Sequence, residues 1–173
     1  YGSFPPAYVA DENGKPMHSW RVLLLPFIEQ SALYDAYNFD EPWDGPNNRK
    51  LHGIVVSGYR CPRDGSPVDT DTNYVAVVGP GTAWPGATAI KLSDFKDGTS
   101  NSLVVVEVVN SGIHWMEPRD LSFDQIEMTI NPKSGQGISS PEGAPSLRTI
   151  SCSFSRASTT LTNVTHSPLI SLR

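Results

Sequence analysis

The sequence predicts an α+β fold, in which a short, kinked helical region near the N-terminus packs on a β-sheet. Apolar residues recur at helical spacing between residues 20 and 37, and Pro26 interrupts them. Beyond residue 50, short β-branched runs alternate with turn residues. The 173 residues include 14 Gly and 15 Pro, which favours short elements joined by many turns. This length suffices for one domain with its own core.

The chain opens with an extended segment. Pro5 and Pro6 fix their own φ angles and push the preceding residue out of the helical region. Residues 11–14, Asp-Glu-Asn-Gly, then predict a turn.

A capped helix is expected next. Ser19 can cap a helix that begins at Trp20, and Pro26 should kink or restart it, which gives about two short helical pieces. The second piece should place its aromatic residues on the same side as Phe27. The apolar positions that define this face are Leu24, Phe27, Ile28, Ala32, Leu33, Tyr34 and Tyr37.

Strands are expected after the turn-rich stretch at residues 41–50. The clearest candidate is Leu-Val-Val-Val-Glu-Val-Val at 103–109, which has the nearly continuous β-branched character of a central strand. The expected strands are 54–60, 73–78, 87–92, 102–109 and 123–130, each bounded by Gly, Pro, Asn or Asp.

The composition changes near residue 141. The last 32 residues contain twelve Ser or Thr, no Asp and no Lys, and they show neither a helical nor a strand period. We therefore expect a globular head over 1–141 and a divergent, poorly ordered Ser/Thr-rich tail over 142–173.

Charge and motif content argue against several functions. The net charge is −5 and the 13 Lys and Arg are scattered, so nucleic acid is not an expected partner. The four histidines lie at least 34 residues apart and no Cys-x2-Cys accompanies them, which argues against zinc. The esterase Gly-x-Ser-x-Gly and the phosphate-binding loop are absent from the sequence. We expect no enzymatic activity and no cofactor, with calcium as the one metal to consider.

The calcium candidates are Asp69, Asp71 and Asn73, which alternate as in a calcium loop. The EF-hand pattern fails, because Tyr74 stands where Gly is required and Pro80 where Glu is required. The alternatives are a calcium site of another kind and a solvated turn that leads into a strand.

Three tryptophans and one acidic residue offer further candidates. Trp43, Trp84 and Trp115 lie in loop-like contexts, where they either bind a sugar or a partner protein or bury themselves at the ends of the sheet. Asp97 to Asn101 forms either a polar cluster beside Glu107 or, more simply, a tight turn. Glu107 should then face solvent or neutralise a basic neighbour such as Arg119.

Six ordered blocks, which together span residues 1 to about 141, resemble a large family of bacterial pseudopilin-like proteins of unknown function. The blocks are YGSFPPA at 1–7, HSWRVLLLPFIEQSALYDAYNF at 18–39, YRCPRD at 59–64, TNYVAVVGPGTAWPG at 72–86, DFKDGTSNSLVVVEV at 94–108 and WMEPRDL at 115–121. Proteins of this kind have a prepilin-type N-terminal helix and a C-terminal His-x9-Asp-Gly motif.

The resemblance implies a fold, a place in the cell and a role. The fold would be a pseudopilin-like head with long loops and an antiparallel sheet, joined to a membrane-anchoring helix that this chain lacks. The head would stand on the periplasmic or extracellular face of the cell envelope. Other pilin-like subunits would be partners through that helix, as in type II secretion or type IV pili. The alternative is a β-rich surface-binding module for carbohydrate or protein that uses the loop tryptophans.

Two departures from the family pattern accompany the resemblance. The family often has a Cys near the end of the absent helix, which implies a partner for Cys61 outside this chain. The His-x9-Asp-Gly ending does not follow Ser140 and Pro141. The tail that replaces it suggests a shifted reading frame, which translation of the gene in its other two frames would test.

Overall fold

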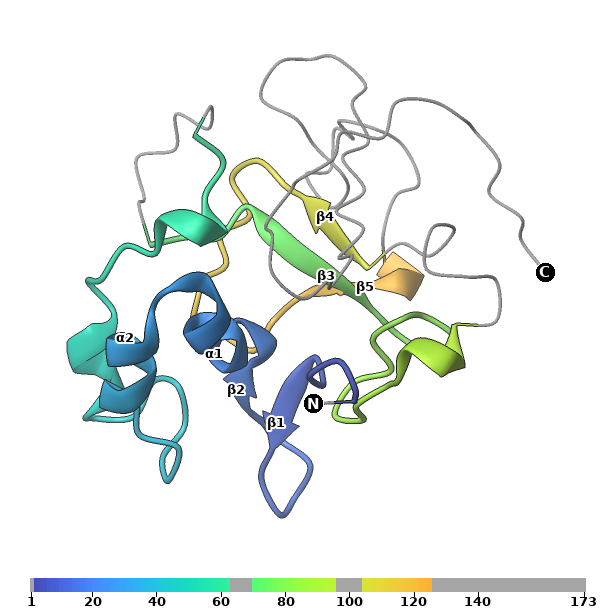
Figure 1. Ribbon diagram of the computed structural model, residues 1–173, viewed down its shortest axis with the longest axis horizontal. Helices are drawn as coiled ribbons and strands as arrows, with labels where there is room; N and C mark the ends of the chain where they lie inside the picture. Colours follow the sequence, from blue (N-terminus) through green and yellow to red (C-terminus); the bar gives the residue numbers. More distant parts are fainter. Residues whose placement is uncertain (1, 63–69, 96–103, 126–173) are drawn as a thin grey trace.

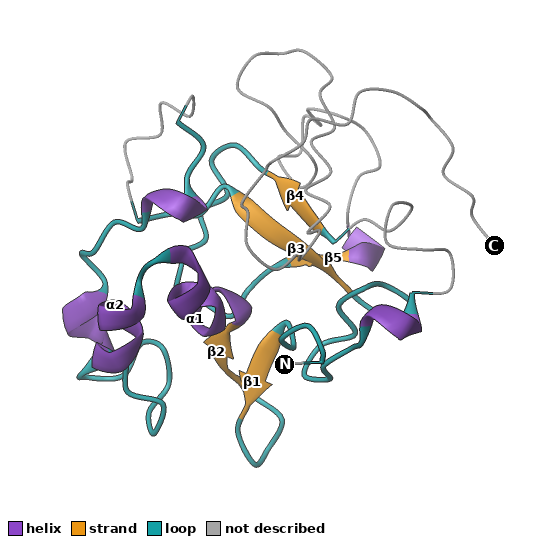
Figure 2. Ribbon diagram, viewed as in Figure 1, coloured by secondary structure: helices purple, strands orange, loops and turns teal. Residues whose placement is uncertain are grey.

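The computed structural model describes residues 2–62, 70–95 and 104–125, which form an α+β fold (Figure 1). The N-terminal hairpin and the helices α1 and α2 lie together beside a small central sheet (Figure 2). The predicted fold class is thereby confirmed. The predicted tail at 142–173 lies outside the described residues, as does the polar turn at 97–101. Among the described helices, none is long and apolar enough to cross a membrane.

The elements follow one another closely along the chain. They are β1 (Tyr8–Ala10), β2 (Pro16–Ser19), α1 (Trp20–Leu24), η1 (Leu25–Ile28), α2 (Ser31–Ala36), η2 (Asn48–Leu51), η3 (Ser57–Tyr59), β3 (Tyr74–Val78), η4 (Leu92–Asp94), β4 (Val105–Glu107), β5 (Leu121–Ser122) and η6 (Phe123–Gln125), where η denotes a 3₁₀ helix.

The first sheet is the hairpin of β1 and β2. Its turn is the predicted one: the side chain of Asp11 accepts the N–H groups of Asn13 and Lys15, and Gly14 has φ +81°. The two strands pair antiparallel with Tyr8 opposite Ser19, and a bulge lies between Val9 and Ala10. These strands were not expected, because they are short and contain Pro16.

The helical region confirms the predicted cap and kink. The Ser19 side chain accepts the N–H of Arg21, and α1 passes into the 3₁₀ turn η1 at Pro26 before α2 begins. The predicted apolar face was wrong in part. Phe27 is 55% exposed and Ala32 is exposed, whereas Leu25 and Tyr37 are buried. The tight 3₁₀ turn and the left-handed Glu29 (φ 62°) break the continuous 3.6-residue period on which that prediction rested.

The second sheet has the order β4-β3-β5, with β3 at its centre. Strand β4 pairs antiparallel, with Val75 opposite Val106, and β5 joins in parallel, with Val77 opposite Leu121. The predictions at 73–78 and 102–109 are confirmed by β3 and β4, the latter as a shorter strand. The faces of β3 contact different apolar clusters: Val75 and Val77 lie with Val106, Val108 and Ile113, while Ala76 lies with Trp20, Trp84, Val104 and Val105.

Three other predicted strands were wrong or lie partly outside the described residues. Residues 54–60 contain the 3₁₀ turn η3, since the chain turns around Gly58. Residues 87–92 form no strand, although the Ile90 carbonyl within this segment accepts the Phe4 N–H. The segment 123–130 begins as the 3₁₀ turn η6 and then leaves the described residues.

Candidate functional site

A buried ion pair joins the helical region to the strand that closes the sheet. Arg21 lies in the first turn of α1, and Asp120 immediately precedes β5. The Arg21 Nη2 and Asp120 Oδ1 atoms are 2.5 Å apart, with side-chain exposures of 0% and 4%. Such a pair is retained only where further hydrogen bonds compensate both charges for the water they have lost.

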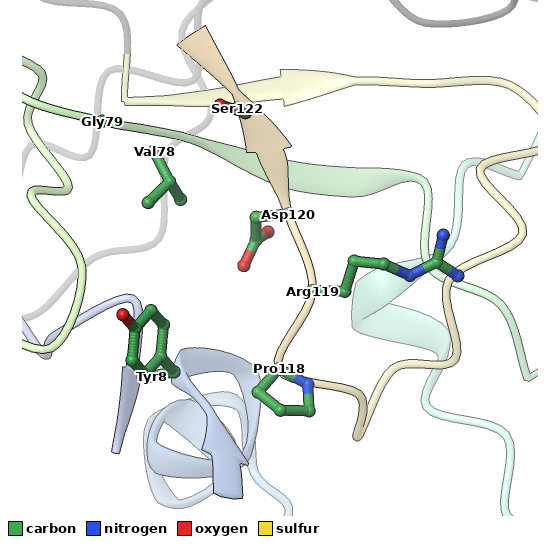
Figure 3. Close-up of a pocket in the computed structure, with 7 residues that line it drawn as sticks. All are labelled: Tyr8, Val78, Gly79, Pro118, Arg119, Asp120 and Ser122. Carbon is green, nitrogen blue, oxygen red and sulfur yellow. The ribbon is translucent and has the colours of Figure 1, made fainter. Parts of the chain in front are cut away.

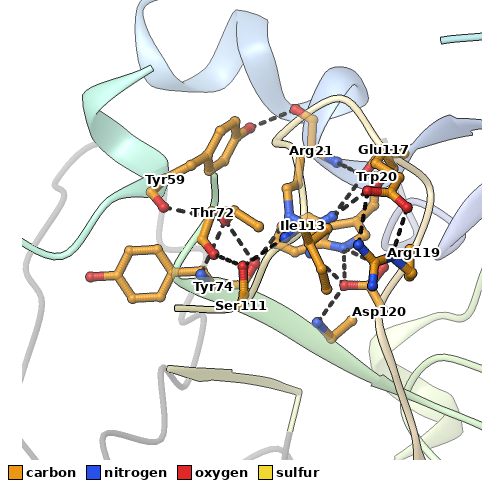
Figure 4. Close-up of polar contacts among 12 residues, drawn as sticks. Trp20, Arg21, Tyr59, Thr72, Tyr74, Ser111, Ile113, Glu117, Arg119 and Asp120 are labelled. Carbon is orange, nitrogen blue, oxygen red and sulfur yellow. Dashed lines mark hydrogen bonds and ion pairs between the residues drawn. The ribbon is translucent and has the colours of Figure 1, made fainter. Parts of the chain in front are cut away.

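Those compensating bonds are present (Figure 4). Asp120 also accepts the backbone N–H of Ala76 at 2.8 Å and the indole N–H of Trp20 at 3.2 Å. Arg21 donates Nε to the Tyr74 carbonyl at 3.0 Å. Its Nη1 donates to the Ser19 hydroxyl at 3.0 Å and to the Glu117 carbonyl at 3.4 Å. The Arg21–Asp120 clasp therefore links α1, β3 and the segment before β5.

Two opposing effects set the charge state of the clasp. Burial raises the pKa of Asp120 above its ordinary value, whereas the adjacent Arg21 guanidinium and the donors on Ala76 and Trp20 act in the opposite direction. Protonating Asp120 would leave the buried Arg21 charge without a counter-ion. The 2.5 Å contact with Arg21, together with donation from the Ala76 and Trp20 N–H groups, is typical of an ionised carboxylate.

A pocket of about 350 Å³ opens beside the clasp (Figure 3). Tyr8 and Val78 form one side, and the Asp120 carboxylate points toward the space between them. Arg119 points away from this space, and it pairs with Glu117 at 2.6 Å. The lining residues are Tyr8, Val78, Gly79, Pro118, Arg119, Asp120 and Ser122.

A second cluster stacks aromatic rings from distant segments. The rings of His52 and His114 lie 4.6 Å apart, with Trp43 against both and Trp115 against His114. His114 Nε2 donates to the His52 carbonyl at 3.0 Å, and its Nδ1 accepts the Met116 N–H at 3.2 Å. Burial lowers the pKa of His114 from its ordinary value. Both ring nitrogens of neutral His114 are thus committed to backbone groups.

Of the three predicted calcium residues, the structure describes Asp71 and Asn73. Asp69 lies outside the described residues. Asp71 is half-buried, and its backbone forms an isolated antiparallel β-bridge with that of His114. Asn73 is 3% exposed, and its amide accepts the Cys61 N–H and donates to the Val108 carbonyl. Asn73 therefore has a structural function. The described residues contain no group of three or more His, Cys, Asp or Glu that could hold a metal ion.

The candidate binding tryptophans do not form an exposed platform. Trp84 is 3% exposed and packs on Trp20 at 5.4 Å, and Trp115 is 1% exposed and donates its indole N–H to the Ile54 carbonyl. Trp43 is half-buried and stacks on His52 with an interplanar angle of 14°. Of the two alternatives for these tryptophans, binding or burial, Trp84 and Trp115 follow burial, because both are core residues.

Glu107 also differs from its prediction. It is 7% exposed rather than facing solvent, and Arg119 pairs with Glu117 instead. Its Oε1 atom and the Trp84 Nε1 atom are buried without a hydrogen-bond partner in the part of the chain that the structure describes. Strand β4 is buried along its whole length, so its one acidic residue is buried with it.

Sequence reasoning did not single out the residues of the clasp. Arg21 and Asp120 are 99 positions apart, and no spacing rule relates such positions. One signal was available: Arg21 is a single charge in an otherwise apolar run, Trp-Arg-Val-Leu-Leu-Leu. A charge in a run that packs against a sheet requires a buried partner.

Comparisons with known proteins extend these observations. No curated protein and no solved structure matches the chain. A family described as "Protein of unknown function (DUF1559)" matches residues 1–90, which carry the hairpin, the helical region, β3, and Trp20 and Arg21 of the clasp. Since this match covers more than half of the chain, the protein belongs to the DUF1559 family of proteins of unknown function.

Proposed function

We propose that this chain is the non-catalytic head of a prepilin-type envelope protein, of the kind that assembles in type II secretion or type IV pili. The head would stand on the periplasmic or extracellular face, joined to an N-terminal helix. That helix would pack with the helices of other pilin-like subunits. The function would then be mechanical, since the head decorates the assembly and selects its partners.

The clasp is the observation that carries this proposal. The sequence blocks that give the chain its resemblance to pseudopilin-like proteins supply the clasp: Trp20 and Arg21 come from 18–39, Ala76 from 72–86 and Asp120 from 115–121. The polar groups of these blocks hydrogen-bond one another in the interior. Residues used in this way stabilise one rigid arrangement, which suits a head that must transmit force.

Exposed apolar side chains give further support. Phe27 is 55% exposed and Val55 is 49% exposed. The segment that contains Phe27 approaches the one that contains Val55. Ile28, next to Phe27, has its Cδ1 atom 3.5 Å from the position that a Cβ on Gly58 would occupy. Apolar surface of this kind favours contact between subunits, since association removes it from water.

The alternative, a surface-binding module that uses loop tryptophans, receives no such support. It needs at least two exposed, coplanar indoles, and Trp84 and Trp115 are buried. The assembly role therefore stays the first proposal.

The proposal is tested with the full-length gene product in its native cell. An epitope tag inserted at the exposed hairpin turn beside Asn13 should leave the fold intact. We expect the tagged protein in the membrane and sheared-filament fractions, and we expect deletion of the prepilin peptidase to leave it in an unprocessed form of larger mass. Recovery from the cytosol, or a mass that the deletion does not change, would overturn the proposal.

A further inference from the structure

The pocket beside the clasp contains a hydrogen-bond acceptor with unused capacity. Asp120 Oδ1 accepts from Arg21, Ala76 and Trp20, whereas Oδ2 accepts only the shared Trp20 indole N–H, at 3.2 Å, among the described residues. An ionised carboxylate offers about four acceptor positions over its two oxygens. Asp120 also lines the pocket, so a ligand there can donate to its free positions.

The walls of the pocket are mostly apolar. Tyr8 comes from β1, Val78 from the end of β3, and Pro118 from the segment that leads to Asp120 (Figure 3). Tyr8, Val78 and Pro118 stand around the space toward which the Asp120 carboxylate points. Ser122 adds a hydroxyl to the lining. An apolar wall with a few polar groups is the usual make-up of a small-molecule site.

The charges around the pocket compensate one another. The Asp120 charge is balanced by Arg21, and the Arg119 side chain points away from the pocket and pairs with Glu117. An added anion would face the Asp120 carboxylate, and an added cation would lie close to the buried Arg21 charge. Either ion would give up its hydration for little gain. The pocket is therefore suited to a neutral ligand that carries hydrogen-bond donors.

We infer that this pocket binds a single neutral sugar ring. The C–H face of a pyranose can pack on the Tyr8 ring while its hydroxyls donate to Asp120 Oδ2 and bond to Ser122. The volume of about 350 Å³ lies at the small end of ligand pockets, which fits one ring and not a chain of rings. This site is independent of the proposed assembly role, because it needs neither the helix nor another subunit.

The test is an NMR titration of the ¹⁵N-labelled 173-residue chain with glucose, galactose and N-acetylglucosamine. At least one of these sugars should give saturable shift changes at the amides of Val78, Gly79, Asp120 and Ser122. We expect a Kd on the order of 1 mM for one ring with few polar contacts. Pentylammonium and acetate serve as charged probes, and we expect no saturation with either.

Variants connect the shifts to the pocket. Val78→Phe should fill the space and weaken binding by about tenfold or more. Leu92→Phe places the same side chain at a position that is 57% exposed and does not line the pocket, and it should leave the Kd unchanged. If Val78→Phe fails to fold, Tyr8→Ala decides the question, because loss of the ring should also weaken binding by about tenfold, through the stacking it removes.

Three results would overturn the inference. The first is the absence of saturable shifts at the four amides with all three sugars. The second is saturation by a charged probe in place of a sugar. The third is a folded pocket variant that binds the sugar as tightly as the unmodified chain. Each of these leaves the assembly proposal standing, since that proposal is tested by processing and fractionation in the cell.

Discussion

Arg21 and Asp120, 99 positions apart in sequence, form an ion pair whose two side chains are 0% and 4% exposed. Removing one partner from a buried pair leaves the other charge uncompensated, which typically costs about 3–5 kcal/mol. We therefore expect Asp120→Asn to lower the free energy of unfolding by about that amount. Urea denaturation followed by tryptophan fluorescence measures this change.

The matched control is the exposed pair of Arg49 and Asp44, whose nitrogen and oxygen lie 3.9 Å apart. Arg49→Met should change the free energy of unfolding by less than about 1 kcal/mol, because surface pairs contribute little. Equal losses of unfolding free energy in the two variants would show that the buried ion pair stabilises the fold no more than the exposed one.

Asn73 should prove structural rather than calcium-binding. Its side-chain amide hydrogen-bonds to the backbone of Cys61 and of Val108, so Asn73→Ala removes both of these hydrogen bonds. We expect a loss of about 1–3 kcal/mol. The exposed Asn13 is the control, and Asn13→Ala should lie near the unmodified chain.

Thermal unfolding of the same variants with calcium and with EDTA distinguishes a structural role of Asn73 from calcium binding. The Tm of the unmodified chain should be the same in both solutions. A Tm that rises with calcium in the unmodified chain but not in Asn73→Ala would restore the calcium candidate.

Acidification should destabilise the fold through His114. Burial lowers the pKa of His114 from its ordinary value of 6.5, so the unfolded chain binds the proton more tightly than the folded one. The stability that neutral His114 provides is complete above pH 6.5 and is lost as the pH falls through the lower, folded value. Protonation also removes the acceptor of the Met116 N–H.

Replacement of the ring isolates this contribution. Unfolding free energies measured at about pH 7.5 and about pH 5.5, on either side of the ordinary histidine pKa, should fall with acidification in the unmodified chain. The fall should be smaller in His114→Gln. His18 is a second buried histidine with a lowered pKa, so His18→Gln should reduce the slope as well. An identical slope in all three chains would contradict this account.

A side chain at Gly86 should destabilise the fold. It has φ +108°, and a Cβ there would stand 3.2 Å from the Tyr8 hydroxyl oxygen. Gly86→Ala should therefore cost backbone strain, about 1 kcal/mol or more, and should also displace Tyr8. Gly14 has φ +81° with open space around it, so Gly14→Ala reports strain alone. Equal losses of unfolding free energy in the two variants would show that the Tyr8 contact adds nothing.

Local signals predicted the local parts of this fold. The cap at Ser19, the interruption at Pro26 and the turn at 11–14 each depend on residues within a few positions of one another, and the structure has all three. Strand β3 and part of β4 followed from β-branched runs. The segment 54–60 had a similar composition, but its backbone turns at η3, which shows that composition without tertiary partners does not determine a strand.

The candidate site could not be predicted in the same way, because its contacts are distant in sequence. The pocket joins β1, the end of β3 and the segment 118–122, and the histidine stack joins residues 52 and 114. Trp84 and Trp115 have loop-like neighbours in sequence, yet they are buried against partners from other segments. Burial of this kind depends on the tertiary arrangement, which one sequence does not display.

A double-mutant cycle on Arg21 and Asp120 tests most directly whether these two distant segments act together to stabilise the fold. Urea unfolding would be measured for Arg21→Met, Asp120→Asn and the double variant. We expect the double variant to be no less stable than either single variant, with a coupling of at least about 1 kcal/mol, because it leaves no unpaired buried charge. Additive losses, with no coupling, would contradict the claim.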